Sequence, residues 1–333
     1  MSVKRRAQIV GTGAALPARV VTNADLEKMV DTTDEWITTR TGIKERRIAC
    51  SDEYLSQFAS PAARQALERA EIEPDQVDLI LCATVTPDMI TPATACFIQE
   101  DLKAKNAAAF DLSAGCSGFL YALTTGQTFI EAGHARTVLV IGGEILSRFI
   151  NWDDRSTCVI FADGAGALVL RAGEGERGVL ASRMHSDGAL ADFITIAGGG
   201  SRYPITPESL ERKVNTIKMR GNETFKVAVR SIEDVSREVI EAAGLTPDQI
   251  DLFVPHQANR RIIDAVAQRL GLDAERCYLN IEKTGNTSAA SIPIALNDVV
   301  EAGRLRPDDH LLMAAFGAGL TWAGAVVRWG RDT

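Results

Sequence analysis

The 333-residue sequence predicts an α/β protein, and three observations lead to that class. Short runs rich in Val, Ile and Leu alternate with longer stretches of helical periodicity, as in sheets whose strands are joined by helices. The composition, 46% hydrophobic and 24% charged, is that of a globular chain long enough for a large core. Several segments also recur at a nearly constant spacing, which indicates two halves of related structure.

The expected strands are almost continuously apolar, as strands are when both faces of their sheet are covered. They are VDLILCATV (77–85), TVLVIGGEI (137–145), IDLFVPHQ (250–257) and HLLMAAFGAG (310–319). The start of the chain is briefly cationic and then apolar, but Gly11, Gly13 and Pro17 interrupt the apolar part. We therefore expect a strand and a turn there rather than a signal peptide, and a cytoplasmic protein that crosses no membrane.

The internal repeat consists of two pairs of strings. EPDQVDLIL (73–81) recurs as TPDQIDLFV (246–254). GCSGFLYALTTGQTFIEAG (115–133) matches GNTSAASIPIALNDVVEAG (285–303), and each ends in a glycine expected to cap a helix. The repeat predicts an N-terminal half and a C-terminal half, over residues 1–175 and 176–333.

Three polar residues stand at connections of this repeat. Cys116 lies at or near a helix N-terminus, where free N–H groups and the helix dipole are expected to lower the pKa of a thiol. Asn286 is expected at the equivalent turn of the second half, and His256 at a strand's carboxyl end, where α/β sheets bind ligands. Singly, each is more often an inert thiol, a satisfied histidine or a helix N-cap. Together with the repeat they predict a reactive cysteine with two polar partners.

Composition argues against several other functions. The net charge of −8 argues against general binding of nucleic acid. The six cysteines form no C-x-x-C pair and have no histidine at a zinc-site spacing, so we expect neither a metal site nor a disulfide framework. They are Cys50, Cys82, Cys96, Cys116, Cys158 and Cys277.

Five strings resemble those of a known family along the whole chain. They are DEWITTRTGIKERRI (34–48), DLSAGCSGFLYAL (111–123), VPHQANRRI (254–262), GNTSAASIP (285–293) and FGAGLTWAGAVVRW (316–329). They are similar to β-ketoacyl-[acyl carrier protein] synthase III, the enzyme that starts a fatty-acid chain. The resemblance implies the thiolase fold, with two duplicated halves in five αβαβα layers and mixed five-stranded sheets. It also implies a cytoplasmic, multifunctional homodimer.

The resemblance implies Cys116, His256 and Asn286 as catalytic residues, and the backbone N–H groups of Cys116 and Ala318 as an oxyanion hole. The Cys116 thiolate would take an acyl group from acyl-CoA. Malonyl-acyl carrier protein (malonyl-ACP) would then lose CO2, and neutral His256 and Asn286 would donate hydrogen bonds to the resulting enolate. Coenzyme A is a substrate here, so we expect no cofactor.

The resemblance also implies the residues that bind coenzyme A and its pantetheine arm. They are Thr32, Trp36, Arg40, Arg155, Met219, Gly221, Phe225 and Asn259. Stacking on Trp36 with cationic contacts from arginines suits an adenine and its phosphates. Without the resemblance, a core tryptophan and solvated arginines would be the simpler interpretation.

An acyl carrier protein is acidic, so a net-negative enzyme needs a local basic patch to attract it. We expect that patch around the histidine loop. The predicted contacts are Gln257, Ala258, Asn259, Arg260, Arg261 and Lys226, and Arg269 lies further along the same segment. An ordinary charged helix face is the alternative.

Thr91 and Phe316 are expected to line the acyl pocket. Thr91 falls where some relatives have a large aromatic residue that closes the pocket of the partner protomer, so longer acyl groups would fit. The opposite wall is unknown, and the primer stays open between acetyl-CoA and other short acyl-CoAs. The polar stretch 198–218 predicts a lid or a dimer-edge loop, with surface decoration as the alternative.

Other functions fit the residues less well. A degradative thiolase would have a second cysteine in place of Asn286, and a hydroxymethylglutaryl-CoA synthase would need a glutamate. A papain-like hydrolase lacks the duplicated α/β pattern, and an inactive partner subunit would have lost Cys116. A related condensing enzyme or acyltransferase of secondary metabolism keeps the cysteine and histidine, so that alternative stays open.

Overall fold

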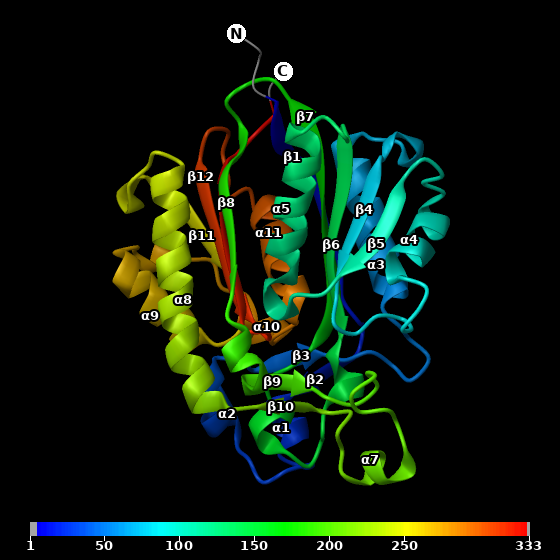
Figure 1. Ribbon diagram of the computed structural model, residues 1–333. Coiled ribbons are helices and arrows are strands. Elements are labelled where there is room, and N and C mark those ends of the chain that lie inside the picture. The colour runs from blue at the N-terminus through cyan, green and yellow to red at the C-terminus, as the bar shows by residue number, and fades with distance from the viewer. Residues whose placement is uncertain (1–4, 332–333) are drawn as a thin grey trace.

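Two sheets with a layer of helices between them form the body of the molecule. The computed structural model describes residues 5–331, and Figure 1 shows five layers, helix–sheet–helix–sheet–helix. This is the αβαβα arrangement that the family resemblance implies. Separate stretches of the chain form the two sheets. The strands of the first sheet end by Gly173, and those of the second begin at Gly178. The predicted boundary at 175 falls in the connection between them.

The first sheet is mixed, as predicted, because the strands on one side of it pair antiparallel and those on the other side pair parallel. Its spatial order is β1 (Arg6–Ala15), β7 (Asp163–Gly173), β6 (Thr137–Ile145), β4 (Leu79–Ala83) and β5 (Ala108–Leu112). The second sheet repeats this order with one strand fewer. Given in the same direction as the first sheet, it consists of β8 (Gly178–Ser186), β13 (Thr321–Arg328), β12 (His310–Gly317) and β11 (Leu252–Pro255).

The prediction of five strands in each sheet is therefore wrong for the second one. The segment equivalent to β5 makes a single parallel bridge, between Phe253 of β11 and Cys277. Polar residues around it, in the sequence DAERCYLN (273–280), replace the apolar run that a full strand requires.

The central layer is the most apolar part of the molecule. Helices α5 (Gly118–Glu131) and α11 (Ser291–Glu301) pack against strands of both sheets in one core cluster. They are buried on most sides, so their sequences are apolar almost all round. The glycines expected to cap them, Gly133 and Gly303, have φ of 81° and 61°, so this expectation is confirmed.

The outer layers are amphipathic helices that bury one face each. Helices α3 (Ser56–Ala70) and α4 (Thr94–Leu102) cover the first sheet, and α8 (Gly221–Ala242) and α9 (Arg260–Leu270) cover the second. In α8 the buried residues Ala228, Ile232, Val235 and Val239 recur every three or four positions, which is the spacing of one helix face.

Shorter elements gather at one end of the layers, at the bottom of Figure 1. The strand pairs are β2 (Val20–Thr22) with β3 (Glu45–Arg47), and β9 (Ile194–Ile196) with β10 (Ile217–Met219). The helices are α1 (Asn23–Leu26), α2 (Asp34–Thr41), α6 (Arg155–Cys158), α7 (Pro207–Glu211) and α10 (Ile281–Thr284).

The two repeated strings align along their whole length, but the helices within them begin at different positions. Helices α5 and α11 end at matching places in their strings, at Glu131 and Glu301, but α11 begins later in its string than α5 does. The residue that begins the 3₁₀ turn before each helix is shifted in the same direction. It is the first residue of the first string, Gly115 with φ of 55°, and the fourth of the second, Ser288 with φ of 50°. Gly285, the first residue of the second string, also has a positive φ, of 64°. Hence α11 is the shorter helix, with 11 residues against 14.

This shift corrects the predicted equivalence of Cys116 and Asn286. Cys116 lies inside the 3₁₀ turn Gly115–Ser117 before α5, whereas Asn286 precedes the corresponding turn, Ser288–Ala290. Asn286 therefore belongs to the loop that leads into its turn.

The polar stretch 198–218 contains α7 and enters β10. Its Lys213 Nζ lies 2.7 Å from Asn151 Oδ1 and 2.5 Å from Asp153 Oδ2, so this stretch is tied to the loop before α6. Among residues 5–331, no helix combines the length and apolar character that crossing a membrane requires.

Candidate active site

The predicted catalytic side chains line one apolar cavity of about 120 Å³. Cys116 comes from the turn before α5, His256 from the end of β11, and Asn286 from the loop before α11. The other lining residues are Ile160, Phe161, Ile194, Met219, Gly221, Thr224, Phe225, Ala228, Ile232, Ala258, Asn259, Ile262 and Phe316. Both halves of the chain therefore contribute to the cavity.

The environment of Cys116 differs from the expectation. Burial raises the pKa of its thiol to about 12, while a hydrogen bond from Ser288 lowers it and the charge of Glu144 raises it further. The expectation of a lowered thiol pKa is thus wrong, because the loss of water on burial raises this pKa more than hydrogen bonding lowers it. The resting cysteine is a thiol and needs a proton acceptor before it can react.

His256 is buried and neutral. Burial lowers the pKa of its imidazole to about 3. Its Nδ1 lies 2.6 Å from Ser291 Oγ, and that hydroxyl accepts a hydrogen bond from the backbone N–H of Gln257 at 3.3 Å. The Ser291 proton is then available to Nδ1, which leaves the imidazole proton on Nε2 as a donor.

Asn286 is held by the other half of the chain. Its backbone N–H donates to Ile160 O at 3.0 Å, and its carbonyl accepts from Ala162 N at 2.9 Å. The side-chain Oδ1 accepts from Ser288 N at 2.8 Å, so the amide NH2 is left to donate. Neutral His256 and Asn286 are thus both oriented as hydrogen-bond donors.

The backbones of Cys116 and Ala318 lie side by side, as an oxyanion hole requires. A Cβ on Gly115 would lie 2.6 Å from Ala318 N, and one on Gly317 would lie 2.3 Å from Cys116 N. Only glycine permits this approach, and Gly115 also has a positive φ. Ala318 can stand where some relatives have glycine, since its contribution is a backbone N–H.

The predicted pantetheine residues gather around the same cavity. Met219, Gly221, Phe225 and Asn259 all line it, as does the predicted acyl-pocket residue Phe316. Thr91 does not line the cavity and is exposed on the loop before α4. Its predicted role concerns a partner protomer and stays a prediction.

The predicted adenine site lies at α2 and α6. The guanidinium groups of Arg40 and Arg155 lie 5.0 Å and 5.2 Å from the centre of the Trp36 ring. Arg155 is also held by the carbonyl of Asp31 at 2.7 Å. An adenine placed between Trp36 and Arg155 would therefore have to displace the arginine. Thr32 contributes a buried hydroxyl that has no hydrogen-bond partner.

The predicted carrier-protein residues divide into exposed and buried ones. Lys226, Arg260 and Arg261 are exposed on α8 and α9, and Ala258 is half-buried beside them. Arg261 lies 5.4 Å from the centre of the Phe225 ring, so it borders the cavity.

The prediction for Gln257 as a surface contact is wrong. Its side chain is fully buried. It donates to Pro255 O and Tyr278 O, and its Oε1 accepts from the backbone N–H groups of Asn280 and Ile281. Gln257 thus fixes the loop that bears His256.

Arg269 is also not part of the patch. It lies at the opposite end of α9 from Arg260 and Arg261, and its Nη1 is paired with Glu233 Oε2 at 3.0 Å. Asn259, in contrast, joins two predicted sites. It caps α9 through Arg261 N, and its Nδ2 donates to the carbonyl of Arg40 at 2.9 Å.

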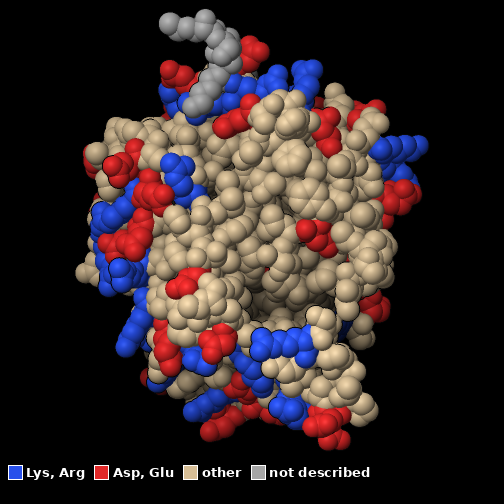
Figure 2. Space-filling view, viewed as in Figure 1, with Lys and Arg blue, Asp and Glu red and all other residues tan. Residues whose placement is uncertain are grey.

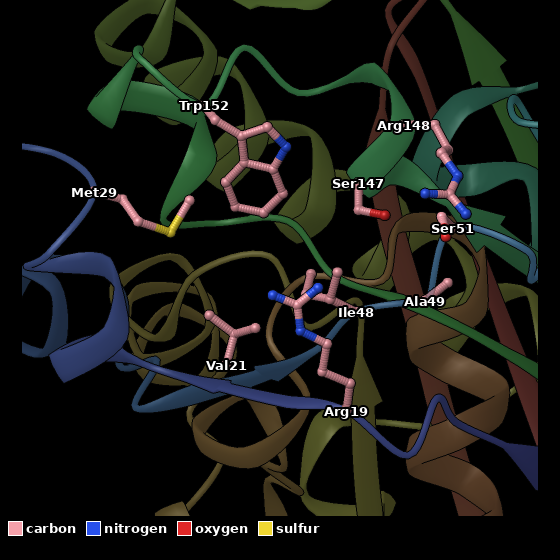
Figure 3. Close-up of a pocket in the computed structure, with 9 residues that line it drawn as sticks. All are labelled: Arg19, Val21, Met29, Ile48, Ala49, Ser51, Ser147, Arg148 and Trp152. Carbon is pink, nitrogen blue, oxygen red and sulfur yellow. The ribbon is translucent and has the colours of Figure 1, made fainter.

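A second cavity, of about 300 Å³, lies near the predicted adenine site (Figure 3). In this view Met29 lies at the left of the cavity, Trp152 above it and Arg19 below it, and Ser147 and Arg148 lie at the right. It shares no lining residue with the Cys116 cavity. Ser147 Oγ donates to Asp163 Oδ2 at 2.6 Å, so this serine is engaged in the fold.

Three polar residues beside the cavity were not predicted from the sequence. Ser291 orients His256, Ser288 contacts the Cys116 thiol, and Glu144 is a fully buried carboxyl group that contacts Ser288. A charged residue at the end of the apolar run 137–145 was the available signal for Glu144. Within residues 5–331, no group of three or more His, Cys, Asp or Glu side chains is placed to hold a metal ion.

The lowered pKa of His256 predicts a specific loss of stability in acid. Below about pH 6.5 the histidine is protonated in the unfolded chain but stays neutral in the folded one, down to about pH 3. Unfolding then takes up a proton, so stability falls as the pH falls through this window. Between pH 7 and pH 5 the wild type should lose about 2 kcal/mol more than His256→Asn, in urea unfolding. Equal losses in both proteins would contradict a neutral buried histidine.

Comparisons with known proteins agree with the geometry. The family model described as 3-oxoacyl-[acyl-carrier-protein (ACP)] synthase III matches residues 110–188, and the model for the C-terminal part of that enzyme matches residues 240–329. The β-ketoacyl-[acyl-carrier-protein] synthase III of Caldanaerobacter subterraneus subsp. tengcongensis is 52% identical over 331 residues. The match covers 99% of this chain and 100% of that protein.

Solved structures give the same result. The crystal structure of 3-oxoacyl-[acyl-carrier-protein] synthase III from Aquifex aeolicus is 49% identical, with a TM-score of 0.90 over 97% of this chain and 100% of that one. The priming β-ketosynthase from the R1128 polyketide biosynthetic pathway is 36% identical, with a TM-score of 0.91 over 100% and 99%. The chain therefore belongs to the β-ketoacyl-[acyl-carrier-protein] synthase III family of acyltransferases and has its thiolase fold.

Proposed function

We propose that this protein joins a short acyl group from acyl-CoA to malonyl-ACP, with Cys116, His256 and Asn286 as the catalytic residues. The products are 3-oxoacyl-ACP, CoA and CO2. One cavity would perform both an acyl transfer and a condensation, and in this sense the enzyme is multifunctional. The observation that supports the proposal is the convergence of a thiol, an imidazole N–H and an amide NH2 in that cavity.

The first step is acylation of Cys116. Its sulfur attacks the thioester carbonyl of acyl-CoA, and CoA leaves as the thioester to Cys116 forms. Negative charge develops on the carbonyl oxygen in this step. The neighbouring backbone N–H groups of Cys116 and Ala318 would stabilise it at no cost in reorganisation, because the glycine contacts fix them in advance.

The second step is decarboxylation of malonyl-ACP. Loss of CO2 moves negative charge onto the oxygen of the malonyl thioester. His256 Nε2–H and the Asn286 amide would both donate to this oxygen. A histidine with so low a pKa has no second proton to give, so it stabilises the enolate without protonating the carbon that must attack the acyl-cysteine.

The substrates would reach the site along α2, α8 and α9. The bond from Asn259 to Arg40 joins the predicted adenine site to the cavity wall. The exposed Lys226, Arg260 and Arg261 would attract an acidic carrier protein to the same opening. Coenzyme A takes part as a substrate, and we propose that the reaction uses no further cofactor or metal.

A priming role in secondary metabolism is the second candidate function. The similarity to the R1128 priming β-ketosynthase over the full chain favours it. Both candidates share the acylation chemistry, and the acyl group accepted by Cys116 distinguishes them.

We also propose a homodimer and a cytoplasmic location. Strand β5 is one of the two edge strands of the first sheet, and its Phe110 is 38% exposed. The loop before α4 contains Met89 and Ile90, and Ile90 is 87% exposed. The end of this loop is held against β5, because the backbone N–H of Thr94 donates to Asp111 Oδ2. Figure 2 shows this part of the face largely free of charged side chains. A reducing compartment suits a nucleophile that must stay a free thiol.

Acylation by a panel of acyl-CoAs tests the proposed function. Intact-mass spectrometry should show one acyl group per chain, and Cys116→Ala should abolish this adduct. Cys50→Ala is the matched control, since Cys50 is exposed and lies outside the cavity. An adduct that persists in Cys116→Ala, or no wild-type adduct from any acyl-CoA, would refute the assignment.

Charge reversal at Arg261 tests the carrier-protein surface. Arg261→Glu should lower kcat/KM for malonyl-ACP about 10-fold or more at low salt, because it repels an acidic partner. Acylation by acyl-CoA should change less than about twofold, since that step needs no carrier protein. Arg64→Glu, exposed on α3 in the opposite outer layer, controls for the change of net charge. Equal losses in both steps would exclude this surface.

Light scattering tests the dimer. The wild type should have twice the chain mass of 35.9 kDa. Phe110→Lys should give monomers, because it places a charge on the pairing edge. Met184→Lys alters a similarly exposed residue (42%) on β8, the edge strand of the other sheet, and should leave the dimer intact. A wild-type mass of one chain would contradict the proposal.

A further inference from the structure

Glu144 is a fully buried carboxyl group to which the mechanism above assigns no role. It lies at the C-terminal end of β6. Its Oε2 accepts hydrogen bonds from Thr86 Oγ1 at 2.6 Å, Thr84 Oγ1 at 3.2 Å and Val85 N at 3.1 Å. All three donors are uncharged, so nothing in this contact set neutralises a carboxylate. Burying a charge in this way is costly, which calls for an explanation beyond packing.

The other carboxyl oxygen faces the catalytic cysteine. Ser288 Oγ donates to Glu144 Oε1 at 3.1 Å, and the same hydroxyl lies close enough to the Cys116 thiol to lower its pKa. Ser288 is itself buried, in the turn that packs beside the Cys116 turn. A hydroxyl accepts and donates at once, so it can pass a proton between the groups on its two sides.

Cys116 needs such an acceptor. Its buried thiol has a pKa raised to about 12. His256 is a poor acceptor, because burial lowers its pKa to about 3 and Ser291 contacts its Nδ1. Burial raises the pKa of Glu144 to about 7, despite the hydrogen bonds that lower it. A group with a pKa near the working pH is the most effective general base.

We propose that Glu144 accepts the proton of Cys116 during acylation, with Ser288 as the relay; the inference rests on the function proposed above. The Sγ proton passes to Ser288 Oγ while the Ser288 hydroxyl proton passes to Glu144 Oε1. The sulfur electron pair then forms the new thioester bond. The bond from the acyl carbon to the CoA sulfur breaks with its electron pair, and the CoA thiolate takes a proton from solvent.

The relay runs in reverse at the end of the cycle. Condensation breaks the Cys116 thioester and returns its electron pair to Sγ. The proton on Glu144 then goes back through Ser288 and restores the thiol. In between, Glu144 is neutral, so the acyl-enzyme contains no buried carboxylate beside the reacting groups. The condensation step itself needs no base, so removal of a proton by the relay is needed for acylation alone.

Glu144→Gln separates this role from simpler ones. Glutamine is nearly isosteric and keeps an acceptor oxygen, but it cannot take up a proton. Single-turnover acylation by acetyl-CoA, followed by intact mass, should slow about 100-fold or more. Glu144→Asp keeps the carboxylate and should lose less than Glu144→Gln. A purely structural role predicts the opposite order, and a purely electrostatic effect of the charge predicts faster acylation in Glu144→Gln, because the thiol pKa would fall.

Ser288→Ala interrupts the relay without changing the carboxyl group. It should slow acylation about as much as Glu144→Gln, and the double variant should be no slower than either single one. It also tests the proposal if Glu144→Gln does not fold. Thr84→Val, which removes a hydroxyl donor on the Oε2 side only, is the control and should acylate within about twofold of wild type.

The outcomes distinguish the relay from the function on which it rests. If wild-type Cys116 is not acylated, the proposed function fails. If it is acylated and Ser288→Ala or Glu144→Gln reacts at the wild-type rate, only the relay is overturned. Losses that add in the double variant also overturn it, because they would show two independent effects.

Discussion

One backbone contact between the two halves of the chain determines the geometry of the site. Asn286 belongs to the second half, but its N–H and C=O groups bond to Ile160 and Ala162 of the first, like one rung of a parallel sheet. The contact fixes the loop before α11 against the loop after α6. Because Ser288 and Ser291 follow in the same segment, it also fixes the contacts to Cys116 and to His256. Separate duplicated halves thereby share one cavity.

Burial makes the groups in this site neutral or weakly ionised at rest. Loss of water raises the pKa values of Cys116 and Glu144 and lowers that of His256. A dry site strengthens each hydrogen bond to a developing negative charge. It also prevents a resting thiolate, so the nucleophile must be generated when the substrate is bound. The burial that strengthens these hydrogen bonds therefore also creates the need for an internal proton acceptor.

The strands and the two related halves could be predicted because they depend on local pattern, whereas the five layers and the roles predicted for Cys116, His256 and Asn286 came from the family resemblance. Apolar runs mark the strands, and repeated strings mark the two halves. The predictions fail for residues whose contacts depend on the direction in which the side chain points or on its place along a helix. Gln257 lies next to His256 in the chain, but its side chain points inward and forms hydrogen bonds with the segment 278–281. Arg269 shares a helix with Arg261, but it lies at the far end and is paired with Glu233.

The same limit applies to Cys116 and to the repeat. A position before a helix suggests a lowered thiol pKa, but the walls that remove water come from α8, β12 and other distant segments. The alignment of the two repeated strings is correct for the ends of α5 and α11, whereas the shift at their beginnings is visible only in the backbone angles. Neither the cavity walls around Cys116 nor these backbone angles can be predicted from a short stretch of sequence.

The imperfect repeat also bears on the homodimer that we propose. An exact duplication would put the same outer strand on both sheets. Within the described part of the chain only the first half has that strand, β5, while the second has a single bridge at Cys277 and leaves β11 as its outer strand. When β5 pairs with the β5 of a second copy, each edge is occupied by the other, and the contact joins two chains. The strand that the second sheet lacks is therefore the one through which we propose that two chains pair.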